Sequence, residues 1–455
     1  MTGSTSPART LWGFTSQFWI LVVGTLINST GSALVFPFIA LYIGRRFNVT
    51  ELEVGGIFTL YAVVSLLSGA AGGAVTDRFG RKVSMIIGLA SAIIFSVILA
   101  FADSLNVILL AIVINGLLSP VFGPASNAMV ADMLPVARRA RGYGLIRVAA
   151  NLGVVIGPLF GGFLADQEGG FLVLFIGDAI TSGIFALLIA FFIRETSPQR
   201  AARPAAAVHR RWLDSLKLFE GYGQIVRDVP FILFALTFLG STLVYSQMNT
   251  NLPLFMDSEG FTASQYSTLI ALNAAMVVFL QFPITAYIER FRHTRILAFG
   301  AVCYGIGFGM FGGLSQMWWF AIGMAILTVG EMVVVPVAQT VVAEMAPEDM
   351  RGRYMGFYGL TWGLSFAIGP LLGGMILSAE GGAYRVVLWQ AALIVGLLGA
   401  GAFLVLGRYL KRRAAQQRWA EVMARYSIDA SPGARQVYQA AAAGTPIIPG
   451  AASEG

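Results

Sequence analysis

Twelve stretches of this sequence run for about 20 residues or more with almost no charged side chain, a length that crosses the hydrocarbon core of a bilayer as a helix. In that core every backbone N–H and C=O group must be satisfied internally, which leaves helices and closed barrels as the possible spans. We therefore predict an all-α membrane protein. Its spans are expected at residues 17–43, 54–76, 83–102, 105–130, 143–165, 170–193, 229–256, 264–288, 295–315, 317–343, 354–378 and 384–408.

The composition excludes several classes of soluble protein. Hydrophobic residues make up 57% of the 455 residues, charged residues only 12%, and the mean hydropathy is +0.75, whereas a soluble domain carries about twice that share of charge. The single cysteine, Cys303, forms no internal disulfide, and with His209 and His293 as the only histidines no Cys/His metal cluster is expected. The first apolar segment is long enough to span and many more follow it, which is not the pattern of a cleaved signal peptide.

Basic residues gather in the segments on one side of the predicted spans. When the N-terminus is placed inside the cell, nearly all of the 30 Lys and Arg residues fall in inside segments. Arg45, Arg46 and Arg385 lie outside, and Arg147 falls just within a span. Positive charge holds loops on the cytoplasmic side. Both termini are therefore predicted to be cytoplasmic, and the net charge of +7 is explained without nucleic acid as a partner.

The longest predicted loop, residues 194–228, divides the chain into two groups of six spans. We predict an N-terminal six-helix bundle at 1–193, a cytoplasmic linker at 194–228, a C-terminal six-helix bundle at 229–410 and a basic cytoplasmic tail at 411–455. In the tail, KRRAAQQRWAEVMARY is typical of a basic helix lying on the inner leaflet. The remainder is rich in Pro, Gly and Ala and is expected to be disordered.

An internal repeat relates the two groups of spans. Residues 122–162 align with residues 334–374 at a constant offset of 212, without a gap and with matching GP and GG dipeptides. The same offset carries the DRF tripeptide at 77–79 onto ERF at 289–291. Two parallel six-span repeats are the arrangement expected of a transporter that rocks two bundles about a site near the midplane.

Two motifs then identify a family. The stretch GGAVTDRFGRK at 72–82 resembles the loop between helices 2 and 3 of the major facilitator superfamily, and GVVIGPLFGG at 153–162 resembles the helix 5 motif of its drug/proton antiporters. The resemblance covers roughly residues 15–410 and implies the major facilitator fold. The loop motif residues are Gly73, Asp77, Arg78, Gly80, Arg81 and Lys82; those of the antiporter motif are Gly153, Gly157, Pro158, Gly161 and Gly162.

The loop motif has a direct physical interpretation. Gly80 lets the loop turn tightly, and Asp77 and Arg81 are spaced to pair on one helix face. The resemblance implies that this loop, together with Asp132, forms a latch that holds the two bundles in the outward-open state. The alternative is a basic loop that only orients the spans.

The helix 5 motif and two departures from the family pattern complete the comparison. Small residues in helix 5 allow close helix contact, and Pro158 favours a kink. The motif is interpreted as an antiporter seal or as ordinary packing. In helix 4, Ile112 stands where drug antiporters carry an arginine, and helix 1 has only Asn28 and no acid. Coupling through those two positions is therefore not expected.

Two carboxylates fall well inside predicted spans, Asp178 and Glu331. A carboxylate within the bilayer is costly and is a functional hypothesis by default, because it can take up a proton on one side and release it on the other. Both are candidate proton-coupling residues. For Glu331 a proton or substrate site is preferred over a hydrogen-bonded packing role, whereas for Asp178 the packing role is preferred.

Polar residues within the spans are candidates to line a substrate cavity. For any one of them, an interhelical hydrogen bond is the more common role of a polar residue in a span. The candidates are Asn28, Asn115, Asn127, Tyr245, Gln247, Asn249, Asn273, Gln281, Gln339 and Trp362.

These features predict a monomeric secondary transporter of the bacterial cytoplasmic (inner) membrane that exports small amphipathic or drug-like molecules by proton-coupled alternating access. Its expected partners are a small-molecule substrate, protons and the lipid bilayer, with no cofactor beyond the proton gradient, no metal and no enzymatic activity. Export of a specific solute such as a sugar, amino acid or siderophore is one alternative. A sensor or lipid-handling scaffold that no longer transports is another.

Overall fold

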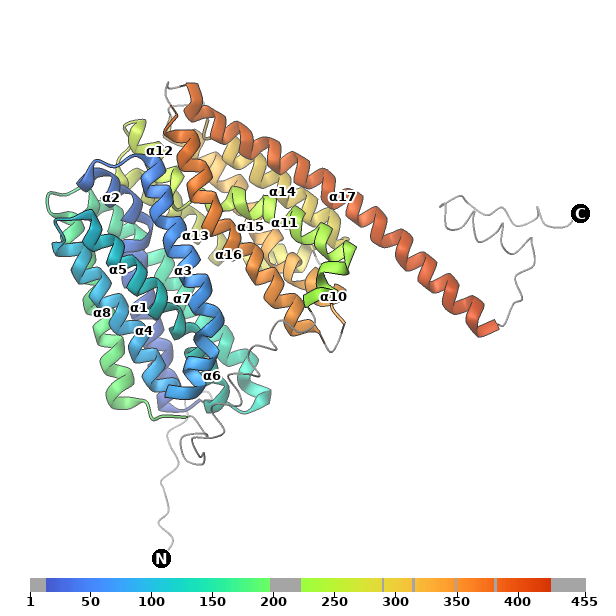
Figure 1. Ribbon diagram of the computed structural model, residues 1–455, viewed down its shortest axis with the longest axis horizontal. Helices are drawn as coiled ribbons and strands as arrows, with labels where there is room; N and C mark the ends of the chain where they lie inside the picture. Colours follow the sequence, from blue (N-terminus) through green and yellow to red (C-terminus); the bar gives the residue numbers. More distant parts are fainter. Residues whose placement is uncertain are drawn as a thin grey trace, which may run out of the picture.

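The computed structural model describes residues 14–196, 222–288, 290–312, 316–347, 350–379 and 383–426, and their regular secondary structure is helical (Figure 1). We refer to residues 14–196 as the N-half and to residues 222–426 as the C-half. The helices are packed side by side, as expected where backbone polar groups have no water to bind. The predicted all-α class is therefore confirmed.

The N-half contains six predicted spans, two of which are interrupted. Each interruption is a single 3₁₀ turn that carries a proline, Pro37 or Pro120, because proline removes a backbone donor and bends the helix. The elements are α1 (Ser16–Val35), η1 (Phe36–Phe38), α2 (Ile39–Phe47), α3 (Glu51–Phe79), α4 (Arg81–Phe101), α5 (Leu105–Leu118), η2 (Ser119–Val121), α6 (Phe122–Met133), α7 (Val136–Ala165) and α8 (Gly170–Phe192).

The C-half repeats this plan. Its elements are α10 (Tyr222–Arg227), α11 (Val229–Ser246), α12 (Asn251–Ser258), α13 (Ala263–Ile288), α14 (His293–Gly309), α15 (Met317–Met345), α16 (Arg351–Leu377) and α17 (Ala383–Tyr426). Elements of the two halves correspond at the offset of 212, so that α2 matches α12, α3 matches α13 and α4 matches α14.

Eleven helical segments of the described residues are long and apolar enough to cross a bilayer, and the protein is a multi-pass membrane protein. The remaining predicted span, 295–315, corresponds to α14, which has 17 residues. The basic segment after residue 410 is continuous with the last span in α17, a single helix of 44 residues, instead of forming a separate helix (Figure 1). The predicted disordered stretch after it lies outside the described residues.

The two halves meet through repeat-related helices. Helix α7 of the N-half packs along α13, and α3 packs along α16 of the C-half. Because α3 corresponds to α13 and α7 to α16, the two contacts are equivalent: each joins the same pair of repeat helices, taken from opposite halves. In Figure 1, α3 and α16 lie side by side near α12 and diverge toward the other end of the molecule.

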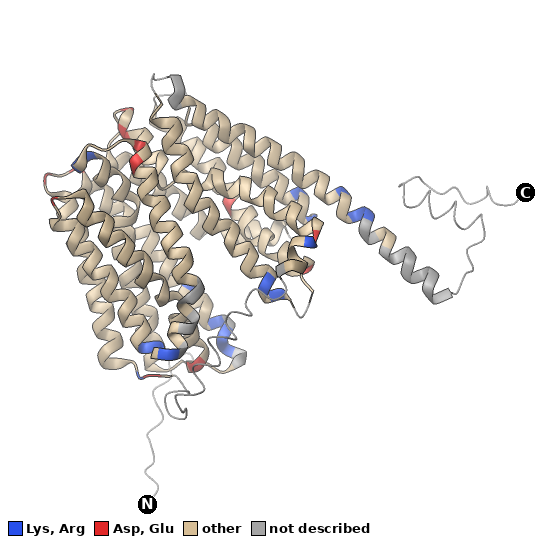
Figure 2. Ribbon diagram, in the orientation of Figure 1, with Lys and Arg blue, Asp and Glu red and all other residues tan. Residues whose placement is uncertain are grey.

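Charged residues distinguish the two ends of the molecule (Figure 2). We call the end that carries Arg78, Arg81, Arg138, Arg292 and Arg351 the basic end. The other end, here the opposite end, carries the turns α2–α3, α7–α8 and α12–α13. Its charged residues include Arg45, Asp103, Asp166 and Asp257.

The glycines of the helix 5 motif mark a close approach of α7 to its neighbours. A Cβ atom on Gly157 would lie 2.6 Å from Ala33 Cβ and 2.7 Å from the Thr30 carbonyl oxygen of α1. Gly162 instead faces Ala263 and Ser267 of α13, in the other half. The motif therefore supports packing within the N-half and contact between the halves at the same time.

We expect Gly157→Val to destabilise the protein by about 1–3 kcal/mol, because the added carbons overpack the contact with α1. The measurement is the thermal unfolding midpoint in detergent. Gly144→Ala on the same helix is the control, since a Cβ there meets open space. Equal midpoints for the two variants would contradict the close α1–α7 contact.

Candidate functional site

Ion pairs and helix caps tie the two halves together at the opposite end. Arg45 of α2 forms an ion pair of 2.5 Å with Asp257 of α12. These two residues occupy equivalent positions of the repeat, since they are 212 apart. The ion pair thus joins α2 of the N-half to the equivalent helix of the C-half, α12, and holds the two halves together at this end.

Asp166, just after α7, caps a helix of the other half. Its Oδ1 accepts from the backbone N–H of Ala263 and its Oδ2 from that of Ser264, both at 2.9 Å, at the start of α13. Partial burial raises the pKa of Asp166, but the hydrogen bonds from α13 outweigh it and hold that pKa below the usual 3.8.

The repeat places a second cap in the equivalent position. Ser378, which is 212 residues after Asp166, accepts from the backbone N–H of Leu52 at 2.8 Å and donates to Glu51 at 3.2 Å. The start of α3 is thus held by the C-half, as the start of α13 is held by the N-half. Sequence analysis missed both caps, although the offset of 212 already pairs the residues involved.

At the basic end the loop motif forms a cluster within the N-half. Arg81 at the start of α4 pairs with Asp132 at the end of α6 at 3.1 Å, and Gly80 adopts φ +90°, which the tight turn requires. Lys82 Nζ donates to the Ala190 carbonyl at 2.6 Å, and Arg78 lies 5.5 Å from the Phe79 ring. The packing of Gly73 and the side chain of Asp77 are not described.

A carboxylate that sequence analysis missed, Glu195, completes this cluster. Its two oxygens accept from the backbone N–H groups of Arg81 at 3.0 Å and Lys82 at 3.1 Å, where the positive end of the α4 dipole favours an anion. A Cβ on Gly80 would collide with it. The described bonds of the cluster join α4, α6 and the segment after α8, so a latch between the halves remains a prediction.

Glu331 is the centre of a polar cluster in the C-half. Its Oε2 accepts from Asn273 Nδ2 at 2.8 Å, and the same amide reaches Thr328 Oγ1 at 3.0 Å. The Tyr245 hydroxyl lies close enough to this carboxylate to interact with it electrostatically. We call Tyr245, Asn273, Thr328 and Glu331 the Glu331 cluster, which draws on α11, α13 and α15. Three of the predicted residues are thereby brought together.

Aromatic rings pack around Tyr245 of this cluster. The Tyr245 ring lies 5.7 Å from Tyr304 of α14 and 5.7 Å from Trp362 of α16, and Phe238 lies 5.8 Å from Trp362. The Tyr304 hydroxyl is buried without a hydrogen-bond partner among the described residues. Aromatic faces attract cations, and a carboxylate adds a full opposite charge. Glu331 itself is half-buried, so binding of a proton or an organic cation there remains a prediction.

Asp178 has a different environment in the N-half. It is 5% exposed, and its carboxylate accepts from Ser96 of α4 at 2.5 Å and Ser32 of α1 at 3.3 Å. One turn further on, Ser182 donates to the Asn28 side chain at 3.0 Å. This column of hydroxyl and amide groups joins α1, α4 and α8, which agrees with the packing role preferred for Asp178.

The remaining cavity candidates are distributed over several helices. Asn115 accepts from Ser91 at 3.1 Å, Gln247 donates to the Gly369 carbonyl at 3.1 Å, and Gln281 donates to the Met332 carbonyl at 2.9 Å. These bonds tie helices together, which is the structural alternative. Asn249 is half-buried, and Asn127 and Gln339 are exposed.

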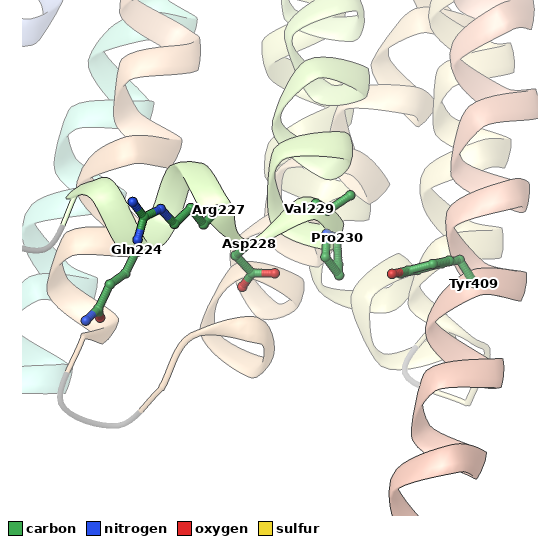
Figure 3. A pocket seen from close by; sticks show the side chains of 6 residues that line it. All are labelled: Gln224, Arg227, Asp228, Val229, Pro230 and Tyr409. Atoms are coloured by element: carbon green, nitrogen blue, oxygen red, sulfur yellow. The ribbon is translucent and has the colours of Figure 1, made fainter.

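A hollow at the basic end of the C-half lies between α10, α11 and α17 (Figure 3). It is lined by Gln224, Arg227, Asp228, Val229, Pro230 and Tyr409. None of the predicted substrate residues lines it. Asp228 accepts from the Tyr354 hydroxyl at 2.8 Å, which fastens the start of α11 to α16. Among the described residues, no group of three His, Cys, Asp or Glu side chains is placed to hold a metal ion.

Comparison with known sequences gives a consistent family. The family model of the Major Facilitator Superfamily matches residues 21–278 and 258–425. The chain is 29% identical to the uncharacterized MFS-type transporter YhjO of Bacillus subtilis, over 85% of this chain and 92% of that protein. It is 28% identical to a Na(+), Li(+), K(+)/H(+) antiporter of Planococcus maritimus, over 77% and 87%. It is 24% identical to the multidrug resistance protein MdtH of Escherichia coli, over 88% and 96%.

Solved structures share the fold. A crystal structure of the peptide transporter POT in complex with sulfate superposes with a TM-score of 0.71 and 18% identity, over 89% of this chain and 98% of that one. At this identity the match concerns the arrangement of helices alone.

We expect Asp166→Ala to favour separation of the halves at the opposite end, because two N–H groups of α13 lose their acceptors. Loss of a cap costs about 1 kcal/mol, roughly a fivefold change in the equilibrium. Hydrogen exchange at the start of α13, in protein reconstituted in nanodiscs, measures it. Glu168→Ala in the same turn is the control, and equal exchange in the two variants would contradict the cap.

The same contact is expected to be insensitive to pH across the physiological range. A carboxyl whose folded pKa is lowered stabilises the folded contact above its unfolded value of 3.8 and loses that contribution as the pH falls through the lowered value. Exchange at the start of α13, corrected for its intrinsic pH dependence, should therefore be constant from about pH 5 to 8. A rise in exchange between pH 7 and 5 would contradict this assignment.

Proposed function

The chain belongs to the Major Facilitator Superfamily and is a secondary transporter and not an enzyme, and from that premise we propose that it exports small amphipathic cations in exchange for protons. The membrane is the bacterial cytoplasmic membrane, with the basic end and both termini in the cytoplasm. The basic end carries the excess of Lys and Arg expected on that side. No cofactor beyond the proton gradient is needed.

The Glu331 cluster is the single observation that carries this proposal. One carboxylate, bonded to Asn273, lies in a cluster that includes Tyr245, and the Tyr245 ring in turn contacts those of Tyr304 and Trp362. A lipophilic cation gains from the charge and from the aromatic faces at once. A proton neutralises the carboxylate and removes the first of these attractions. Proton and substrate therefore compete for one group, which is the simplest basis for exchange.

The contacts between the halves support an alternating-access cycle. The ion pair of Arg45 with Asp257 and the caps at Asp166 and Ser378 close the opposite end. Closure there corresponds to a state open toward the cytoplasm, in which Glu331 gives up its proton and accepts the cation. Breaking these contacts opens the other side, where a proton displaces the cation. The loop motif with Asp132 and Glu195 is proposed to act as a latch in that second state.

Two relatives bear on the substrate. The name of MdtH describes multidrug resistance, and that of the Planococcus protein describes exchange of alkali cations for protons. Alkali cation exchange is a second candidate for this chain. The observation in its favour is the oxygen-only set of Asp178, Ser32 and Ser96, since hard cations prefer oxygen ligands. The aromatic rings packed around Tyr245 favour the organic cation.

The test is proton-driven uptake of a fluorescent organic cation into inverted vesicles, comparing wild type with Glu331→Gln. We expect the variant to lose at least tenfold in ΔpH-driven transport, because the amide takes up no proton. Tyr245→Phe, which removes a neighbouring hydroxyl and leaves the carboxylate in place, should lose less.

Asp178→Asn is the matched control, since it neutralises the other buried carboxylate. It should retain dye transport. Normal pumping by Glu331→Gln would contradict the proposed role of Glu331. Sodium-driven proton movement that Asp178→Asn abolishes, with no transport of the dye by wild type, would favour alkali cation exchange.

A further inference from the structure

An ion pair at the basic end of the C-half involves a histidine. His293, the first residue of α14, lies with Nδ1 3.0 Å from Oε2 of Glu344 near the end of α15. Both side chains are accessible to water, with 32% of the histidine and 59% of the glutamate exposed. Protons from the aqueous phase at that end therefore reach the pair without crossing the protein.

The internal repeat relates this pair to an equivalent ion pair in the N-half. Subtracting the offset of 212 from His293 gives Arg81, and subtracting it from Glu344 gives Asp132. Arg81 and Asp132 form the equivalent ion pair of the N-half at 3.1 Å. Each half thus ties the start of its third span to the end of its fourth span with a base and an acid. The geometry is conserved between the halves, whereas the base is not the same.

The exchange of bases changes how the two pairs respond to protons. A guanidinium remains charged at any physiological pH. An imidazole is the side chain that ordinarily gains and loses its charge between about pH 5 and 8. The N-half pair is consequently permanent, whereas the C-half pair is an ion pair when His293 holds two protons. When His293 holds one, on Nδ1, the pair is a weaker hydrogen bond from a neutral imidazole to the Glu344 carboxylate.

We propose that His293 and Glu344 form a proton-binding switch at the basic end, which tightens the contact between α14 and α15 when the adjoining solution becomes acidic. Protonation of the imidazole places a cation against the Glu344 carboxylate. Deprotonation leaves the carboxylate without that charge. The switch lies outside the Glu331 cluster, and it shares no residue with the contacts that close the opposite end.

The other charged groups that the structure describes around this pair are basic. Arg295 lies on α14, Arg292 is the N-cap residue at its start, and Arg290 in the preceding turn stacks at 4.8 Å over the Tyr287 ring. Arg351 and Arg353 lie at the start of α16. On α17, Gly407 abuts Thr294, and Arg408 follows it. Glu289, Glu348 and Asp349 lie outside the described residues. Among the described residues of these elements, Glu344 is the acid that faces His293.

The consequence for transport rests on the proposed function. If the basic end is cytoplasmic, acidification of the cytoplasm strengthens one of the two tethers and leaves the other unchanged. The halves then differ in their response to the same proton concentration. A proton exporter and a proton importer would both gain a means of sensing cytoplasmic pH at a group separate from the coupling carboxylate.

The switch itself is tested without transport, by hydrogen exchange of the full-length protein in nanodiscs between about pH 5.5 and 8, corrected for intrinsic exchange. In wild type, protection at the end of α15 should fall about two- to fivefold as the pH rises, the range measured for exposed ion pairs. His293→Arg should remove this pH dependence while it retains the protection seen at low pH. Glu344→Gln should also remove it, at the lower level of protection.

The N-half supplies the reciprocal control. In wild type, exchange at the end of α6 should be independent of pH, and Arg81→His should make it pH-dependent. Parallel profiles for wild type and His293→Arg would overturn the proposal, as would an absence of pH dependence in wild type. Neither result depends on whether Glu331 couples transport to protons, so failure of the switch and failure of the proposed function are distinguishable.

Discussion

Closure at one end through equivalent residues is the constraint on which the arrangement of the two halves depends. Arg45 pairs with Asp257, the residue at the equivalent position of the other half. Asp166 and Ser378 cap the first turns of helices in opposite halves. A helix start leaves N–H groups without partners, and here the partner half supplies the acceptors. These contacts define a closed end and can still break, because they are partly exposed and each cap contributes only about 1 kcal/mol to stability.

Much of the fold could be predicted from the sequence because the bilayer imposes length and polarity on every span. The apolar runs predicted the helices, and the offset of 212 predicted which helices of the two halves correspond. The interruptions at Pro37 and Pro120 follow from the missing donor of proline. The continuous helix α17 was not predicted, because its basic residues are compatible both with a helix on the leaflet and with one that extends into water.

The site was less accessible to prediction. The loop motif and the family resemblance identified Arg81 and Asp132, and Glu331 stood out as a carboxylate within an apolar span. Glu195 and Asp166 belong to short polar turns, where an acid is ordinary, and their importance comes only from the backbone N–H groups that tertiary packing places against them. Gln247 and Asn115 illustrate the converse: they are polar residues in spans, but their described bonds fasten helices together.

The repeat also shows where the residues of the two halves differ. At the offset of 212 the residues of the Glu331 cluster have unrelated counterparts: Glu331 corresponds to Ser119, Asn273 to Tyr61 and Tyr245 to Ala33. Asp178 corresponds to Gln390. The contacts between the halves thus recur at equivalent positions even where the residue types differ, as with Asp166 and Ser378, whereas the residues of the Glu331 cluster do not recur. The proposed cation exchange at Glu331 thus depends on residues that the C-half has and the N-half lacks. At the basic end, His293 in the position equivalent to Arg81 is a further difference between the halves.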